Sequence, residues 1–200
     1  MPAVKVGGRT LKNGTDFTIS YKNNTEPGTA TLSVTGKGNY SGSVAKTFKI
    51  TARAINDVEV TVPDTVFTGE QVRPDVVVSY GNYQFINNSD YTLSFKDNVN
   101  IGTASVVVTG KKHLSGSRTV TFPIEKADVS STEIAVENAT FTGSAIKSDV
   151  DVKLGAVTLK EGTHYTLSYN NNVNAGTAQV TVRAKGRLEG AVTKDLPSAK

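Results

Sequence analysis

The sequence contains no cysteine and no tryptophan, and it has only two histidines, His113 and His164. The missing cysteine excludes disulfide scaffolds, cysteine-based zinc sites and thiol catalysis. The sequence has no apolar run of about 18 residues, the length that a membrane-spanning helix needs. The N-terminus also lacks the basic-then-apolar pattern of a secretory signal. With 37% hydrophobic and 20% charged residues, the chain of 200 residues is still apolar enough to fold around a core.

The chain repeats itself with a period of 74 residues. The string Tyr-Thr-Leu-Ser begins at Tyr91 and at Tyr165, and Phe17-Thr-Ile-Ser is its third copy. Glycines keep the same spacing without insertion or deletion, at Gly28, Gly102 and Gly176 and at Gly42, Gly116 and Gly190. A unit of this length can fold as a small domain of its own, unlike the shorter repeats of solenoids.

Two full periods leave 52 residues over, and these set the predicted boundaries. Phe48-Lys-Ile50 and Phe122-Pro-Ile124 look like closing strands, and Leu196 occupies the same place near the C-terminus. We therefore predict a truncated unit at 1–52, lacking its N-terminal third, and full units at 53–127 and 128–200. On this interpretation the sequence is a piece of a longer protein. The truncated unit exposes core residues and unpaired strand edges, unless a neighbouring chain completes it.

Apolar residues alternate with polar ones within each unit. Tyr91, Leu93 and Phe95 share one face of a predicted strand, and Val58-Val60-Val62 and Ala104-Val106-Val108 continue the pattern. A period of two predicts strands with one buried face, and no helical period of useful length occurs. Clusters of Asn, Gly and Asp separate the strands. The sequence thus predicts an all-β protein of tandem small antiparallel β-sandwich domains.

One turn is predicted in detail. Asn24, Asn98 and Asn172 occupy one repeat position, and a glycine follows four residues later in each unit. Because Asn and Gly tolerate a positive φ, the loop is predicted to turn a hairpin between two strands. A β-branched residue at Gly102 should then destabilise its unit.

The string from Gly14 to Tyr21 and the string Gly36-Lys-Gly-Asn-Tyr-Ser-Gly42 resemble the bacterial immunoglobulin-like repeats of Gram-positive surface proteins. The likeness covers essentially the whole chain. It implies Ig-like sandwiches and an extracellular setting, as in cell-wall-attached adhesins and large secreted enzymes. The second and third units depart from this string at Gly110-Lys-Lys-His-Leu and Ala184-Lys-Gly-Arg-Leu, which fall in a turn.

The net charge of +4 does not indicate nucleic-acid binding. Residues 1–52 carry seven Lys and Arg against two acidic residues, a net charge of +5. Residues 53–127 have a net charge of −1 and residues 128–200 a net charge of 0. The basic excess therefore belongs to the truncated unit, and no basic stripe with interleaved aromatics is left for nucleic acid.

Candidate catalytic and metal-binding residues do not repeat with the period. His113 aligns with Asn39 and Arg187, and His164 aligns with Asp16 and Asp90, so both histidines are interpreted as turn residues. Asp97-Asn-Val-Asn100 resembles half of a calcium loop, but the other units lack its carboxylate. The sequence therefore predicts no catalytic residues, no metal site and no cofactor. Lys37, Lys111 and Lys185 do recur, and an isopeptide crosslink would require them to be buried.

The repeated aromatic residues are predicted to fill the core. Phe17, Tyr91 and Tyr165 share one position on the apolar face, whereas Tyr83 aligns with Arg9 and Val157 and does not recur. A single exposed tyrosine is not a sugar-binding platform. The leading interpretation is a non-catalytic spacer or stalk of an extracellular adhesin, with neighbouring repeats as its partners. The alternative is a binding module of an adhesin, or an accessory domain of a secreted carbohydrate-active enzyme, which binds host glycoprotein, mucin or polysaccharide through variable loops such as Tyr80–Phe85.

Overall fold

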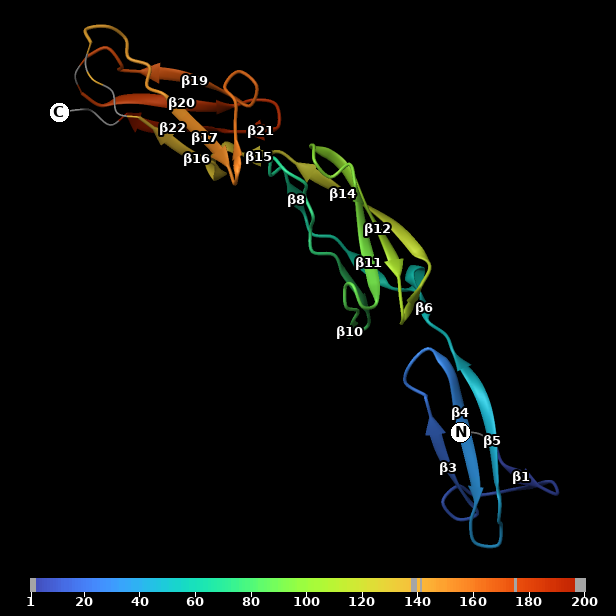
Figure 1. Cartoon of the computed structure of the whole chain (residues 1–200). Coiled ribbons are helices and arrows are strands. Elements are labelled where there is room, and N and C mark those ends of the chain that lie inside the picture. Colours follow the sequence, from blue (N-terminus) through green and yellow to red (C-terminus); the bar gives the residue numbers. More distant parts are fainter. Residues whose placement is uncertain (1–2, 138–139, 141, 175, 197–200) are drawn as a thin grey trace. The chain divides into compact units, whose positions relative to one another are not determined.

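The computed structural model describes residues 3–137, 140, 142–174 and 176–196, and this part of the chain is all-β (Figure 1). Its helical turns are two short 3-10 turns, η1 (Ile55–Asp57) and η2 (Val129–Ser131). The prediction of an all-β protein is confirmed. In the described residues no helix is both long and apolar enough to cross a membrane.

The chain divides into two compact units. One comprises residues 1–59, 78–92 and 108–118, and the other comprises residues 60–77, 93–107 and 119–200. The predicted unit 53–127 contributes residues to both. The division into 1–52, 53–127 and 128–200 therefore stays a prediction, and these ranges are called segments 1, 2 and 3 below.

Segment 1 forms a short antiparallel hairpin and a three-stranded antiparallel sheet in the order β3–β4–β5. Leu11, Phe17 and Ala30 are its buried apolar side chains. The strands are β1 (Lys5–Val6), β2 (Arg9–Thr10), β3 (Phe17–Lys22), β4 (Gly28–Gly36) and β5 (Ser43–Ile50).

Segment 2 contains sheets in the orders β10–β9–β7 and β11–β12–β14–β8, and a two-stranded pair of β6 and β13. Val78, Val106 and Val108 are fully buried in its core. The strands are β6 (Arg53–Ala54), β7 (Glu59–Thr61), β8 (Thr65–Val66), β9 (Val77–Tyr80), β10 (Tyr83–Gln84), β11 (Tyr91–Lys96), β12 (Gly102–Gly110), β13 (Leu114–Ser115) and β14 (Ser117–Glu125).

Segment 3 contains antiparallel sheets in the orders β16–β17–β18 and β19–β20–β22, and its strand β21 pairs with β15, which spans the boundary between segments 2 and 3. The Tyr165 and Tyr169 hydroxyls of β19 donate hydrogen bonds to the carbonyls of Val150 and Ser148 beside the other sheet, as in a β-sandwich. The strands are β15 (Ala127–Asp128), β16 (Glu133–Val136), β17 (Val150–Leu154), β18 (Val157–Thr158), β19 (Tyr165–Asn170), β20 (Ala178–Ala184), β21 (Leu188–Glu189) and β22 (Ala191–Leu196).

The predicted alternation of buried and exposed side chains is confirmed in the central strands. On β12, Ala104, Val106 and Val108 are buried, and the residues between them are more exposed. Val180 and Val182 on β20 are likewise fully buried. Alternate residues of a strand point to opposite faces, so the apolar set of each strand enters one core.

The prediction of purely antiparallel sheets is incomplete, because three short pairs are parallel. They are β6 with β13, β8 with β14, and β15 with β21. In each pair a strand near the start of a segment runs beside a strand near the end of the same repeat, in the same direction. Such a pairing joins residues far apart in sequence, and no hairpin turn signals it.

The predicted glycine turn is confirmed at Gly102, which has a φ of +124°, and its counterparts Gly28 and Gly176 have φ values of +150° and +144°. The accompanying residue of positive φ is Asp97, one position before the Asn98 that the sequence indicated. Asn23 and Asn171, the counterparts of Asp97, also have a positive φ. Both backbone features thus recur at the 74-residue period.

Replacing Gly102 by Val should destabilise the part of the chain around β12. A β-branched residue rarely adopts a positive φ, and the strain costs about 1–3 kcal/mol. Nothing lies within 4 Å of a Cβ built at Gly102, so the effect isolates backbone strain from steric overlap. Urea unfolding followed by NMR signals of β11 and β12 measures it, with Thr103→Val as the exposed control. An unchanged unfolding midpoint for Gly102→Val would contradict the strain argument.

Candidate functional site

A tight turn before β3, β11 and β19 has the same hydrogen bonds in all three segments. The last side chain of the turn accepts the backbone N–H of the residue four places earlier. The donor–acceptor distances are 2.8 Å for Lys12 N to Asp16 Oδ2, 2.8 Å for Ile86 N to Asp90 Oδ2, and 2.9 Å for Lys160 N to His164 Nδ1. This position therefore closes a turn, and a carboxylate or an imidazole nitrogen can serve equally.

His164 accordingly replaces an aspartate in a local structural role. Its Nδ1 accepts the Lys160 N–H, so the ring proton of the neutral imidazole lies on Nε2. The backbone carbonyl of His164 also accepts the N–H of Lys185 at 2.8 Å. The interpretation of His164 as a turn residue agrees with these contacts.

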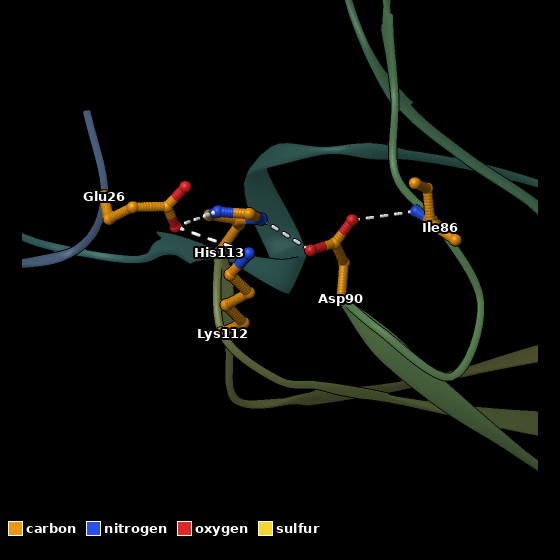
Figure 2. A network of polar contacts seen from close by, with 5 residues as sticks. All are labelled: Glu26, Ile86, Asp90, Lys112 and His113. Carbon is orange, nitrogen blue, oxygen red and sulfur yellow. Dashed lines mark hydrogen bonds and ion pairs between the residues drawn. The ribbon is translucent and has the colours of Figure 1, made fainter.

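In segment 2 the same turn carries a larger polar network (Figure 2). The Nδ1 atom of His113 lies 2.5 Å from Oδ1 of Asp90, and its Nε2 atom lies 2.5 Å from Oε2 of Glu26. The Lys112 Nζ is 3.5 Å from the same Glu26 oxygen. Asp90 is only 1% exposed, and its second oxygen accepts the Ile86 N–H. The sequence did not indicate this cluster, because its members come from three separate loops.

The network favours the charged forms of its members. The hydrogen bond to Asp90, and then the one to Glu26, raise the pKa of His113 above its usual value. Burial alone would raise the pKa of Asp90, but the bonds from Ile86 N–H and His113 outweigh it, and the pKa is lowered. The bond from His113 lowers the pKa of Glu26. A protonated imidazole between two carboxylates is thus the favoured state.

The contacts of His113 fit an ion pair better than a general base. A general base needs a free ring nitrogen within reach of the proton that it removes. Both nitrogens of His113 already contact carboxylates. The counterparts of His113 are Asn39 and Arg187, so the histidine at the centre of this cluster does not recur at the 74-residue period. Its chemistry is that of a local ion-pair cluster.

The recurrent asparagine is a backbone clamp, which sequence reasoning missed. Asn98 Nδ2 donates to the Val72 carbonyl at 2.8 Å, and Val72 N donates to the Asn98 carbonyl at 2.7 Å. Asn172 and Ile146 form the same pair of bonds at 2.7 and 2.8 Å. Asn98 lies in Asp97–Asn100, the string that resembles half of a calcium loop, and its side-chain amide is hydrogen-bonded to the backbone of Val72. In the described residues no group of three or more His, Cys, Asp and Glu side chains could hold a metal ion.

The recurrent lysines lie in exposed turns. Lys37 Nζ donates to the Gly14 carbonyl at 2.8 Å, and Lys185 Nζ donates to the Gly162 carbonyl at 2.7 Å. Lys111, at the corresponding position, is exposed as well. These positions do not provide the buried lysine that an isopeptide crosslink requires.

The shared aromatic position fills the core, and a different pair of tyrosines reaches the surface. Phe17, Tyr91 and Tyr165 are buried, as predicted. Tyr80 and Tyr83 lie opposite each other in the β9–β10 hairpin, and their exposed fractions are 49% and 53%. The sequence singled out Tyr83 alone, because the counterparts of Tyr80 are the apolar Val6 and Leu154.

A polar hollow of about 790 Å³ lies between the sheets of segment 3. Tyr169 and Ser148 both line this hollow, and the Tyr169 hydroxyl donates a hydrogen bond of 2.8 Å to the Ser148 carbonyl. Its charged lining residues are Glu137, Lys147, Asp149, Asp151 and Glu161. Most of these charges have uncharged counterparts in segment 2, where Pro63, Val77 and Asn87 replace Glu137, Asp151 and Glu161. Most of the charges that line the hollow are therefore not shared by segment 2.

The contribution of His113 to stability should depend on pH. Because the folded-state pKa is raised, this contribution is complete below the unfolded value of about 6.5 and is lost as the pH rises through the folded value. His113→Asn should therefore cost more stability at about pH 5 than at about pH 9. Urea unfolding followed by NMR signals of β11 measures the cost, and Asp90→Asn should reduce the pH dependence. An equal cost at both pH values would contradict the ion-pair interpretation.

Comparison with family models, with curated proteins and with solved structures finds no match to this chain. The resemblance to immunoglobulin-like surface repeats therefore stays a prediction drawn from the sequence motifs.

Proposed function

We propose that this chain is a non-catalytic, tension-resisting spacer of a bacterial extracellular protein, built from Ig-like repeats. The observation that carries the proposal is the parallel pairing of the two ends of segment 2. Arg53 and Ala54 pair with Leu114 and Ser115, and β8 pairs with β14 near the end of the segment.

Parallel end strands are well suited to carry tension. When the two ends of segment 2 are pulled apart, β8 and β14 are displaced along their own length. The hydrogen bonds between them are then loaded together instead of one after another. The Phe67 N–H to Glu125 carbonyl bond at 2.9 Å and the Thr65 hydroxyl bond to the Pro123 carbonyl extend this contact.

The roles of the recurrent residues support a structural function. The shared side chains fill cores, as Tyr91 and Tyr165 do, or close turns, as Asp90 and His164 do. The side-chain amides of Asn98 and Asn172 donate hydrogen bonds to backbone carbonyls of the same segment. A spacer needs these packing and turn residues in every unit and needs no shared pocket. The extracellular setting rests on the resemblance of the repeat strings to Gram-positive surface proteins.

Single-molecule pulling tests the mechanical role. The chain has no cysteine, so paired cysteines can define the direction of force. Handles at Thr51→Cys and Lys126→Cys load β8 and β14 in shear, and handles at Thr68→Cys and Lys126→Cys peel them apart from one end. All three sites are exposed. The shear pair should unfold at a several-fold higher force, and equal forces for the two pairs would exclude the proposed role.

A binding module is the second candidate, and the exposed Tyr80–Tyr83 pair favours it. Aromatic faces in water bind the apolar faces of sugars and cationic groups. The Arg53 guanidinium lies 3.5 Å from the Tyr80 ring centre, which leaves Tyr83 as the more available face. On this alternative the partners are host glycans, mucin or surface proteins.

A glycan array and a mucin-binding assay on the full chain distinguish the two candidates. If the module binds sugars, Tyr83→Ala should weaken binding about tenfold, because one stacked ring is lost. Val66→Ala, at a similarly exposed residue of β8, should leave binding unchanged. Binding that is equal in both variants would remove the tyrosine pair from consideration.

A further inference from the structure

One repeat position contacts the preceding segment at both junctions of the chain. It is occupied by His113 in segment 2 and by Arg187 in segment 3, which are 74 residues apart. The His113 side chain contacts Glu26 of segment 1, and the Arg187 side chain contacts Phe67 of segment 2. Each pair lies within one of the two compact units of the chain. The same position thus places a side chain that carries or can acquire a positive charge against the preceding segment.

The backbone of this position also holds the connecting strand. The His113 carbonyl accepts the N–H of Arg53, the first residue of β6, at 2.9 Å. The Arg187 carbonyl accepts the N–H of Ala127, the first residue of β15, at 3.4 Å. Two residues separate β5 from β6, and one residue separates β14 from β15. A single residue therefore binds the short connection through its backbone and the preceding segment through its side chain.

At the first junction the imidazole of His113 bridges two carboxylates (Figure 2). Its Nδ1 atom contacts the buried Asp90 and its Nε2 atom contacts Glu26, each at 2.5 Å. An isolated ion pair at the surface contributes little, partly because two mobile side chains must be held in one geometry. Here Asp90 already holds the ring with Nε2 toward Glu26, so less freedom is lost when Glu26 binds.

At the second junction the contact is apolar and closely packed. The guanidinium carbon of Arg187 lies 5.4 Å from the centre of the Phe67 ring, within the range of a cation–π contact. Two residues further along the chain, a Cβ built on Gly69 would lie 2.8 Å from Cγ2 of Val157 in β18. Gly69 therefore packs directly against segment 3. Neither the guanidinium nor these apolar groups change charge near neutral pH.

We propose that the position of His113 and Arg187 is a joint that fixes each segment to the preceding one, closed by protonation at His113 and permanently closed at Arg187. The protonated imidazole donates to both carboxylates, whereas the neutral ring has one N–H and can donate to only one of them. The buried Asp90 retains it, and Glu26 is released. This joint goes beyond the spacer function and does not rest on the tension-bearing pair of β8 and β14, which lies inside segment 2.

The groups around His113 set the pH range in which the first joint is closed. The hydrogen bonds to Asp90 and Glu26 raise the pKa of His113, and the bond from His113 lowers the pKa of Glu26. The joint is therefore complete below the unfolded value of about 6.5 and is lost as the pH rises through the folded pKa of His113. At the acid end it is lost when Glu26 becomes protonated. Positive side chains on the adjoining turn and strand are Lys111, Lys112 and Arg53.

Residual dipolar couplings of the isotope-labelled full chain test both joints, with alignment tensors fitted separately to the three segments. Segments 1 and 2 should share one tensor at about pH 5.5 and lose it at about pH 9, because the imidazole is then neutral. Segments 2 and 3 should share one tensor at both pH values. Separate tensors of segments 1 and 2 at about pH 5.5, or a shared tensor at both pH values, would overturn the pH-dependent joint.

Two variants assign the pH effect to the contact of His113 with Glu26. Glu26→Asn introduces the residue found at the same position in the other segments, Asn100 and Asn174, and should separate the tensors of segments 1 and 2 at both pH values. His113→Arg should retain the shared tensor at about pH 9, because a guanidinium stays protonated. Since the second variant preserves a contact, misfolding cannot imitate its expected result. Loss of the shared tensor in His113→Arg at about pH 9 would contradict the joint.

Gly69→Ala should separate the tensors of segments 2 and 3, because the added Cβ overlaps Val157. Gly143→Ala is the matched control, since Gly143 is the counterpart of Gly69 and has a φ of +77° against +85°. No atom of the described residues lies within 4 Å of a Cβ built at Gly143, so the two variants share the backbone strain and differ in the overlap. Arg187→Asn, with the residue of Asn39, should also separate the tensors. A shared tensor in both Gly69→Ala and Arg187→Asn would overturn the second joint.

Discussion

Segments 2 and 3 depend on the return of their opening residues to their closing strands. In segment 2, Ile55 fills the core beside Gly116, and the backbone of Val72 is hydrogen-bonded to both the backbone carbonyl and the side-chain amide of Asn98. A domain of this size buries a modest apolar area. Loss of one strand from its core would therefore expose a large fraction of that area to water. In segment 1 the sheet β3–β4–β5 forms, and Phe48 on its apolar face is 41% exposed.

The turn before the first long strand shows how one backbone geometry accepts different chemistry. Asp16, Asp90 and His164 all accept the same backbone N–H, yet only Asp90 also binds a histidine. The second carboxylate oxygen of Asp90 is what makes this extension possible, since one oxygen closes the turn and the other pairs with His113. A structural position can thus acquire an ion pair without any change in the turn.

Sequence reasoning predicted those features that depend on near neighbours along the chain. The alternation at Ala104, Val106 and Val108 and the positive φ at Gly102 follow from period two and from local backbone sterics. It missed the clamp of Asn98 and the exposure of Tyr80, because both depend on residues that only folding brings close. Likewise the contacts of His113 with Asp90 join separate loops, and no spacing in the sequence indicates them.

The sequence by itself determined the period of 74 residues, the all-β class and the identity of the core positions, because these follow from local alternation and repeated strings. Only the tertiary structure decided which strands close each repeat, since parallel pairs such as β8 with β14 join residues about 60 positions apart along the chain. It also decided that the asparagine of each loop is a clamp, and that Asn24 is left facing solvent. The physical reason is that hydrogen bonding and burial depend on proximity in space, which a one-dimensional pattern does not encode.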